Sequence, residues 1–467
     1  MMAATKESQS PAPPPSIAVH VVESRAPERK NSQRCGIGEN VKFSTESLES
    51  YFFAGWDPVA YDAMLLAAAV EFADRTQRRP ALGWMREMEL RIPVHEPDCW
   101  NSTSVTESLR SALNLLTGDR WQFEFYKCRK TAEKPRQGLL SLDADVEAVI
   151  PFSNGLDSRA VAGLMSRSLG KKLVRIRLGA KLQESEALSR RRAAFTSVPY
   201  KVQSGSREFV EKTARSRGFK FALISGLAAH LAKATQVIVP ESGQGALGPA
   251  LVTVGQGYED YRSHPLFTTR MEKFLTALLG RSPRYHFPQL WETKGETLKR
   301  FVTECEEGSA WSLTRSCWQQ NRHASVDQKK RQCGVCAACM LRRMSVHAAG
   351  LQEPNDGYVW ENLAAPNFRA GAAPSFDPRK ITGAMREYAI AGVLHLDHLA
   401  ALPQSEANAG TLAVGAFQLA EVLGITESEA RGKLDRLLRQ HSKEWSGFVH
   451  SLGENSFVAD WAVSGRS

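Results

Sequence analysis

The stretch from Ala148 to Leu169, AVIPFSNGLDSRAVAGLMSRSL, constrains the fold more than any other part of the chain. Residues Val146–Phe152 are mostly apolar and predict a short buried strand. Apolar residues then recur at helical spacing after Asp157 and Ser158, whose carboxylate and hydroxyl favour the start of a helix. A polar turn therefore joins a strand to a helix N-terminus, where unpaired N–H groups and the helix dipole favour a phosphate.

The turn itself, Ser153 to Ser158, reads SNGLDS and supplies donors for such an anion. The hydroxyls of Ser153 and Ser158 can donate hydrogen bonds, and Gly155 allows the backbone to approach a ligand closely. The same six residues also suit an ordinary polar turn, so the pattern alone leaves both interpretations open. The pattern G-x-x-x-x-G-K-S/T is absent, which argues against ordinary γ-phosphoryl transfer.

A second motif is formed by half of the eight cysteines. Cys317, Cys333, Cys336 and Cys339 follow the spacing C-x15-C-x2-C-x2-C, which is typical of metal ligands and not of a disulfide framework. Four thiolates would fill every position around a zinc ion, so we expect a structural Zn²⁺ site. An iron–sulfur cluster is the main alternative, but no Cys-Pro pair follows the third cysteine.

Length and composition indicate several domains. A chain of 467 residues exceeds one ordinary core, and 42% hydrophobic residues can fill two or three. No run of 18 uncharged apolar residues occurs, so no membrane span is expected, and the cysteine usage favours the cytoplasm. The net charge is +10, but the basic clusters lack interleaved aromatic residues, so direct nucleic-acid binding is not expected.

We expect four regions along the chain. They are a flexible tail (1–35), an N-terminal α/β domain (36–138), the phosphate-loop domain with the cysteines (139–365) and a helical C-terminal region (366–467) that begins with a small-residue linker at Gly371–Pro378. The periodicity predicts helices at Ala60–Ala73, Val105–Leu116, Ala416–Leu423 and Ala430–Leu438, and strands at Met88–Val94 and Trp121–Tyr126.

Further strands at Lys172–Leu178 and Gln236–Pro240 alternate with helical segments, which predicts a doubly wound parallel sheet. Ligands of such sheets bind beyond the carboxyl ends of the strands. Glu241 and Gln244 follow the later strand and could read the edges of a heterocycle, although a plain turn explains them equally well.

Three more side chains are candidates for contacts with phosphate or carboxylate, namely His264, Arg270 and Lys294. Lone histidines and lysines are more often structural or solvated. We interpret Cys99 and Cys128 as ordinary thiols, and His395, Asp397 and His398 as a packing or interaction surface, because their spacing does not place all three on one helix face.

The turn SNGLDS resembles the S-G-G-x-D-S signature of the PP-loop ATP pyrophosphatases, with Asn154 in place of the first glycine. Asparagine tolerates a left-handed backbone and can donate to a phosphate. Together with SCWQQ and CGVCAACMLRR, the turn resembles the 7-cyano-7-deazaguanine synthase (QueC) family over roughly residues 146–348. The added flanks, RSHPLF and TKGE look like the longer QueC-like proteins of anti-phage defence cassettes, such as the QatC proteins.

This resemblance implies an α/β fold of the adenine nucleotide alpha hydrolase type and ATP-dependent ligation with Mg²⁺. A carboxylate such as that of 7-carboxy-7-deazaguanine would be adenylated, pyrophosphate would leave, and an amine would displace AMP. In the defence-associated branch the amine would belong to a partner protein. The resemblance assigns Ser153, Asp157 and Ser158 to catalysis and the nucleotide phosphates to Ser153, Asn154, Gly155, Leu156, Asp157 and Ser158.

Three alternatives stay open at this point. The chain could make 7-cyano-7-deazaguanine for queuosine or deazapurine biosynthesis. It could modify tRNA, although the thiolation enzymes often need cysteine pairs that the metal would occupy here. It could also be a non-catalytic nucleotide-binding scaffold, for which Asn154 is the only indication.

Overall fold

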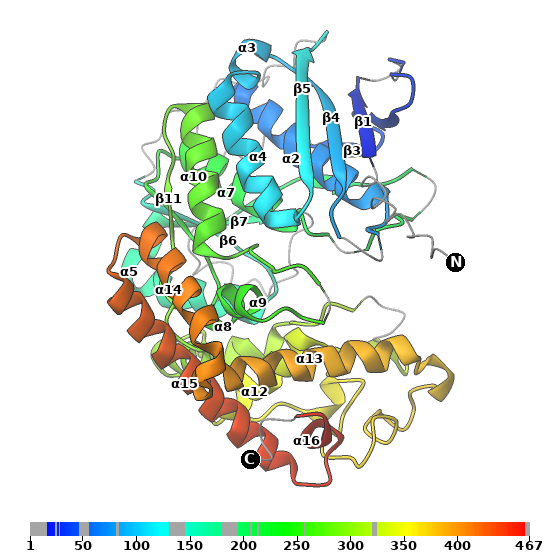
Figure 1. The fold of residues 1–467 in the computed structure, drawn as a ribbon, viewed down its shortest axis with the longest axis vertical. Helices are drawn as coiled ribbons and strands as arrows, with labels where there is room; N and C mark the ends of the chain where they lie inside the picture. Colours follow the sequence, from blue (N-terminus) through cyan, green and yellow to red (C-terminus); the bar gives the residue numbers. More distant parts are fainter. Residues whose placement is uncertain are drawn as a thin grey trace, which may run out of the picture.

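The computed structural model describes most of the chain: residues 16–23, 26–27, 29–45, 56–80, 84–129, 145–178, 195–205, 208–212, 214–255, 257–319 and 325–462, without the side chains of 195–197. Figure 1 shows three tiers along the longest axis. An N-terminal sheet with α2 and α4 forms one end, β6 and β7 lie in the middle, and α12, α13, α15 and α16 form the other end.

The N-terminal sheet has the order β2-β1-β4-β5, and all of its pairs are parallel. Its strands are β1 (Ser16–Val22), β2 (Gln33–Gly36), β4 (Glu87–Val94) and β5 (Arg120–Lys127). The predicted strands at 88–94 and 121–126 are confirmed. The expected tail is wrong from residue 16 onward, because β1 pairs on both sides and buries Val19 and Val21. Residues 1–15 lie outside the described part.

Helix α2 (Pro58–Thr76) crosses this sheet and confirms the helix predicted at 60–73. Asp57 caps it, since its carboxylate accepts hydrogen bonds from the N–H groups of Val59 and Ala60. The helix is buried on nearly every side because it packs between the sheet and α7 (Arg217–Leu231). The predicted helix at 105–116 corresponds to α4 (Thr103–Thr117), which follows the short α3 (Pro97–Trp100) and packs along α10 (Pro265–Leu279).

These contacts join the N-terminal sheet to the rest of the molecule through one hydrophobic core. The core continues from Val21 of β1 through α2, α4, α7 and α10 to Val149 of β6 and Val174 of β7. A small antiparallel pair, β3 (Val41–Phe43) with β9 (Tyr200–Val202), also links the two parts. The expected boundary near residue 138 therefore does not separate two independent cores; the segment 130–144 that carries most of the expected linker lies outside the described residues.

The second sheet is the doubly wound sheet that the sequence predicts. Its order is β11-β10-β6-β7-β8, and every pair is parallel. The chain winds from β6 to β8 in one direction and returns to β10 and β11 on the other side of β6, so the winding reverses between β6 and β10. The strands are β6 (Ala148–Pro151), β7 (Leu173–Leu178), β8 (Phe195–Val198), β10 (Gln236–Ile238) and β11 (Arg284–His286).

Helices pack against both faces of this sheet. Helices α7 and α10 cover the side that meets the N-terminal part, whereas α5 (Leu156–Leu169) packs against α11 (Lys294–Glu304). Two one-turn helices, α8 (Gly243–Ala246) and α9 (Gly248–Leu251), follow β10. The 3-10 helix Gly308–Leu313 and a small hairpin, β12 (Ser325–Val326) with β13 (Lys329–Lys330), precede α12 (Ala337–Ala348).

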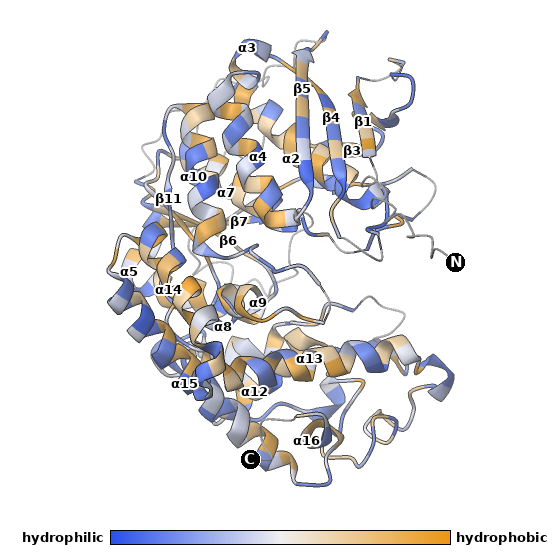
Figure 2. Ribbon diagram, viewed as in Figure 1, coloured by the Kyte–Doolittle hydropathy of each residue, from blue (hydrophilic) through white to orange (hydrophobic). Residues whose placement is uncertain are grey.

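The C-terminal helices share a core with the cysteine segment. They are α13 (Gly383–Ala401), α14 (Ala409–Leu423), α15 (Glu427–Leu452) and α16 (Phe457–Trp461). Helices α14 and α15 confirm the two predicted amphipathic stretches, and Figure 2 shows hydrophilic and hydrophobic residues alternating along α15. Met385 of α13 and Trp445 of α15 belong to the same buried cluster as Cys333 and Cys336.

The expected linker at Gly371–Pro378 is instead part of this core. The N–H of Ala373 donates to the carbonyl of Val359 over 2.7 Å, and Phe376 is buried. Small residues were a misleading signal here, because they allow the chain to pack closely against Trp360. In the described part of the chain no single helix is long and apolar enough to cross a membrane; one bent pair, Glu406–Leu423 with Glu427–Leu452, reaches that length and composition.

Candidate nucleotide site and cysteine cluster

The SNGLDS turn lies where the winding of the second sheet reverses. It follows β6, and β10 and β7 flank that strand on its two sides. Helix α5 begins at Leu156, directly after the turn. Open α/β sheets bind ligands in the crevice at this reversal, beyond the carboxyl ends of the strands. The predicted strand–turn–helix is therefore confirmed, and its turn occupies the position where such a fold binds ligands.

Hydrogen bonds within the turn bring its hydroxyl groups together. The oxygens of Ser153 and Ser158 are 2.9 Å apart, and the N–H of Gly155 donates to the Ser153 hydroxyl over 3.1 Å. Gly155 has an extended backbone, with φ −73° and ψ 154°, and its missing Cβ leaves open space apart from that hydroxyl. Leu156 is buried in the core between α5 and α11, so only its backbone is available to a ligand.

The left-handed backbone that the sequence suggested for Asn154 is not observed, because its φ is negative. Asn154 instead accepts two hydrogen bonds from other segments of the chain. The Asn154 carbonyl accepts a hydrogen bond from the N–H of Arg315 over 2.8 Å, which ties the turn to the segment before Cys317. Its side-chain oxygen accepts one from Nη2 of Arg177 over 3.1 Å.

Asp157 and Lys294 form an ion pair at the start of α5. The Asp157 Oδ2 and Lys294 Nζ atoms are 2.6 Å apart, and both side chains are largely buried. Lys294 is placed there by the first turn of α11, which Thr293 and Glu296 stabilise with a capping box. The other Asp157 oxygen, Oδ1, is buried and accepts no hydrogen bond from the described residues.

Glu241 adds a third titratable group beside this pair. Its carboxyl folds over Gly245, where a Cβ would come within 2.0 Å of Oε1. Burial and then the negative charge of Asp157 raise the pKa of Glu241 to about 8, against the opposing effect of Lys294. The predicted residues Asp157, Glu241 and Lys294 thus come together from three separate segments.

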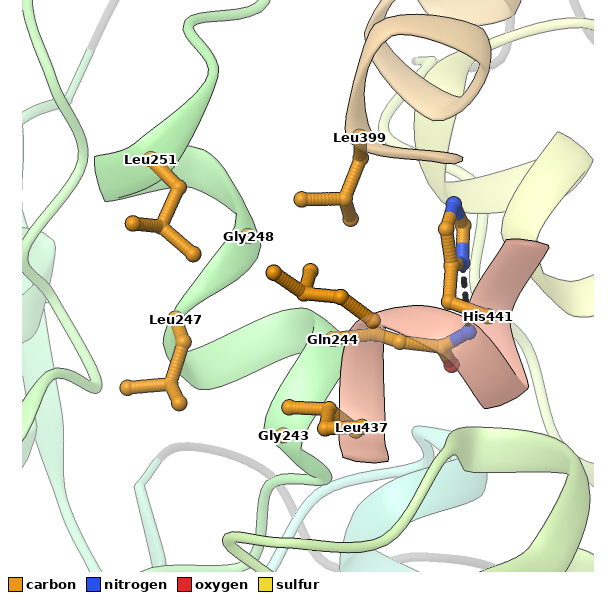
Figure 3. A pocket seen from close by; sticks show the side chains of 9 residues that line it. Gly243, Gln244, Leu247, Gly248, Leu251, Leu399, Leu437 and His441 are labelled. Atoms are coloured by element: carbon orange, nitrogen blue, oxygen red, sulfur yellow. Dashed lines mark hydrogen bonds between the residues drawn. The ribbon is translucent and has the colours of Figure 1, made fainter. Parts of the chain in front are cut away.

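Gln244 connects the backbone of Lys294 to α15. Its Oε1 accepts a hydrogen bond from the Lys294 N–H over 2.8 Å, and its Nε2 is 2.7 Å from Nδ1 of His441 on α15 (Figure 3). Nε2 of His441 is 2.8 Å from the carbonyl of Leu396 and must carry the proton, so Nδ1 accepts from Gln244. Burial lowers the pKa of His441 to about 4, which agrees with a neutral ring. Gln244 is 2% exposed, and both ends of its amide are occupied by protein.

The space around Gln244 is too small for a ligand. Leucines from α9, α13 and α15 surround it in Figure 3, and the space that they leave does not admit a water molecule. Gln244 therefore does not read a heterocycle as the sequence suggested; it connects the segment after β10 with the segment that carries Lys294.

The structure places the last two candidates elsewhere. His264 is buried and caps α10, since its Nδ1 accepts a hydrogen bond from the N–H of Leu266 over 3.1 Å. Burial lowers the pKa of His264 to about 4. Arg270 lies on α10 and donates to the carbonyl of Ser111 on α4 over 2.8 Å. His264 thus caps its own helix and Arg270 joins α10 to α4, and neither makes a hydrogen bond with the turn in the described part of the chain.

Arg177 is a site residue that the sequence reasoning missed. It lies near the carboxyl end of β7, one strand away from the turn, and its guanidinium reaches Asn154. The available signal was a basic residue at the end of a predicted strand beside the turn. It was not read because the pairing of β6 with β7 is a long-range contact.

The four cysteines form one cluster, as their spacing predicts. Their sulfur atoms lie within 4.8 Å of one another, and those of Cys333 and Cys339 are 3.8 Å apart. Backbone N–H groups point at three of the sulfurs: that of Cys333 at Cys317, that of Cys336 at Cys333 and that of Cys339 at Cys336. Four thiolates with N–H donors fit a tetrahedral Zn²⁺ ion.

Gly334 shapes the knuckle between two of these cysteines. Its φ is +87°, and a Cβ would lie 2.9 Å from the carbonyl of Trp360. Three arginines lie close to the cluster in sequence, and two of them pair with carboxylates: Arg331 with Glu361 and Arg342 with Glu353. Arg343 donates instead to the carbonyls of Trp360 and Glu361 and fastens the knuckle to the following segment.

Comparison with known proteins agrees with this arrangement. Residues 246–350 match the family described as "Queuosine biosynthesis protein QueC". The chain is 38% identical to 7-cyano-7-deazaguanine synthase of Cupriavidus taiwanensis over 71 residues, which are 15% of this chain and 27% of the relative. It is 32% identical to that of Dechloromonas aromatica over 117 residues, 23% of this chain and 48% of the relative.

The chain thus spans between about a quarter and about a half of the length of these curated relatives. The matched region includes Lys294 and all four cysteines, whereas the SNGLDS turn precedes it. Residues 246–350 of this chain are thus similar to QueC, and they lie within an α/β fold that carries a four-cysteine cluster.

Proposed function

We propose that this protein uses ATP to adenylate the carboxylate of a 7-deazaguanine, such as 7-carboxy-7-deazaguanine, and passes the acyl group to an amine. The observation that carries the proposal is the ion pair between Asp157 and Lys294. It brings the predicted phosphate turn into contact with the region that matches QueC. The names of the relatives support a deazaguanine as the substrate.

The turn would hold the phosphates of ATP. The hydroxyls of Ser153 and Ser158, which are 2.9 Å apart, and the N–H groups at the start of α5 would donate to the phosphates, and the helix dipole adds positive potential. Lys294 would balance negative charge on the other side. The buried Oδ1 of Asp157 fits a ligand for Mg²⁺, an ion that would neutralise charge developing on the phosphates.

The proposed reaction has two steps. A carboxylate oxygen of the substrate attacks the α-phosphorus of ATP, the bond to the β-phosphate oxygen breaks, and pyrophosphate leaves. The amine then attacks the acyl carbon, AMP leaves with the bonding electrons, and the amine loses a proton to form an amide. Adenylation is needed because oxide is a poor leaving group and AMP is a good one.

The identity of the amine separates two versions of this function. In the first, the amine belongs to a partner protein of an anti-phage defence cassette, and the deazaguanine becomes attached to that protein. The N-terminal sheet lies outside the region matching QueC and would be available to such a partner. In the second, ammonia is used and the amide is dehydrated to the nitrile; the name 7-cyano-7-deazaguanine synthase of the relatives supports it.

The test is pyrophosphate release from ATP by the purified full-length protein with 7-carboxy-7-deazaguanine, with and without ammonium. We expect substrate-dependent release that Ser153→Ala and Asp157→Asn each reduce by about 100-fold, the size of effect found when one transition-state donor is removed. Ser168→Ala is the matched control, because Ser168 is exposed on the same helix.

Mass spectrometry of the same reaction distinguishes nitrile, amide and protein conjugate. Release that does not depend on the deazaguanine would contradict the proposed substrate. ATP binding without any release would instead favour a nucleotide-binding scaffold, and release that requires tRNA would favour a tRNA-modifying enzyme.

A further inference from the structure

The side of the turn next to β7 is rich in cations, in contrast to the side next to β10. Arg177 donates to Asn154 in the turn, and the guanidinium of Arg175 lies 5.2 Å from the ring centre of Phe152. Asp157 and Glu241 lie on the opposite side together with Lys294. An anion approaching the turn would therefore be drawn toward Arg177.

The guanidinium of Arg177 is suited to bind an anion. Its Nη2 donates to Asn154, whereas its Nη1 is buried and has no hydrogen-bond partner among the described residues. Burial lowers the pKa of Arg177, and no carboxylate of the described chain acts against that shift. A buried guanidinium nitrogen without an acceptor is costly, and a bound anion would remove that cost.

Asn154 fixes the direction of this guanidinium. Arginine can only donate, so the side-chain oxygen of Asn154 must face Nη2, and its Nδ2 amide group must point away. None of the described residues accepts a hydrogen bond from that Nδ2. The carbonyl of Asn154 accepts a hydrogen bond from the N–H of Arg315, which ties the turn to the segment before Cys317.

We propose that Arg177 binds a phosphate group of the nucleotide, and that Asn154 is the positioning residue that holds it beside the turn. This inference rests on the proposed function and adds a contact to it. Asn154 stands where the PP-loop signature has its first glycine, and the φ of Asn154 is negative, so this backbone does not need glycine. The asparagine instead supplies a side chain that orients a cation from the neighbouring strand.

The test is isothermal titration of inorganic pyrophosphate, with Mg²⁺, into the full-length protein and four variants: Asn154→Ala, Asn154→Gly, Arg177→Ala and the double variant Asn154→Ala/Arg177→Ala. We expect Arg177→Ala to weaken binding about tenfold or more, as for a lost hydrogen bond to a charged group. Asn154→Ala should weaken it about threefold or more, and the double variant should match Arg177→Ala, because Asn154 acts through Arg177.

Asn154→Gly is the sharpest variant, because it restores the signature. We expect it to bind pyrophosphate as weakly as Asn154→Ala; binding equal to or tighter than wild type would overturn the positioning role. Arg167→Ala is the control, since Arg167 is exposed on α5 and pairs with Glu304. Arg177→Lys should lie between wild type and Arg177→Ala, because it keeps the charge and loses the fork that Asn154 orients.

Two failures are distinguishable. Wild-type binding that Arg177→Ala leaves unchanged, or additive losses in the double variant, would overturn this inference and leave the phosphate turn intact. Absence of pyrophosphate binding by the wild type, with the same absence in Ser153→Ala, would contradict the proposed function and this inference together.

Discussion

Glu241 is held beside a carboxylate and largely out of water, which makes the stability of the protein depend on pH. Its pKa is about 8 in the folded protein and 4.5 as an ordinary carboxyl group. The folded state therefore holds this proton more tightly than the unfolded state. The stabilising contribution is complete below pH 4.5 and is lost as the pH rises through 8.

Glu241→Gln should remove this dependence, because a glutamine stays neutral at every pH. We expect the Tm of the variant to approach that of the wild type at pH 5 and to exceed it at pH 8.5. Thermal unfolding at both values measures the difference, with Glu304→Gln on the exposed end of α11 as the control. A difference between variant and wild type that is the same at both pH values would show that Glu241 does not titrate in this range.

At the scale of elements, the segment after β10 depends on its glycines for close packing against α15. A Cβ on Gly243 would lie 2.2 Å from the carbonyl of Leu290 and 2.6 Å from Leu437. We expect Gly243→Ala to destabilise the protein by about 1–3 kcal/mol, because backbone cannot yield as a side chain can. Gly432→Ala is the matched control: it lies within α15 in open space and should stabilise by about 0.5–1 kcal/mol.

Urea unfolding of both variants gives the two values. A loss at Gly243 no larger than the effect at Gly432 would mean that α8 moves freely relative to α15. Pyrophosphate release by Gly243→Ala should also fall, since α8 carries the Gln244 that bonds to the backbone of Lys294.

The same elements show how far sequence reasoning reaches. The turn, the cysteine spacing and the long helices are local patterns, and they were predictable because a helix cap, a metal knuckle and an apolar stripe depend on neighbours in sequence. The role of Gln244 was not predictable, because it depends on His441, which lies 197 residues away. Strand β1 was missed because Pro-rich residues precede it and obscured a short apolar run.

At the scale of the whole molecule, a buried charge network connects the N-terminal sheet to the second half. Arg86 is completely buried and pairs with Asp74 over 2.6 Å and with Asp119 over 2.8 Å. The same Asp74 accepts a hydrogen bond from the N–H of Ser216, the N-cap residue of α7. The network therefore joins elements on both sides of the expected domain boundary.

Arg86→Met should leave two carboxylates buried with less compensation and cost about 3–5 kcal/mol. Arg120→Met, at an exposed pair with Glu87, should cost less than about 1 kcal/mol. Because one core spans both halves, we expect Arg86→Met to lower a single calorimetric transition that includes both sheets. Two separate transitions, with only one shifted, would show that the halves unfold independently.

The cysteine cluster provides the corresponding test for the other end of the molecule. Its sulfurs belong to the core that includes Trp360 and Trp445, and α15 carries the packing from that core to Gly243. We expect about one zinc per chain by elemental analysis, and no visible absorbance of the kind that iron–sulfur clusters give. A strong chelator should lower the Tm, change the tryptophan fluorescence and weaken pyrophosphate binding together, since a structural metal contributes its binding energy to folding.

Cys333→Ser should reproduce all three effects, whereas Cys305→Ser, at a cysteine outside the cluster, should reproduce none. If chelation changes the fluorescence but leaves pyrophosphate binding intact, the metal stabilises its own core without supporting the nucleotide site.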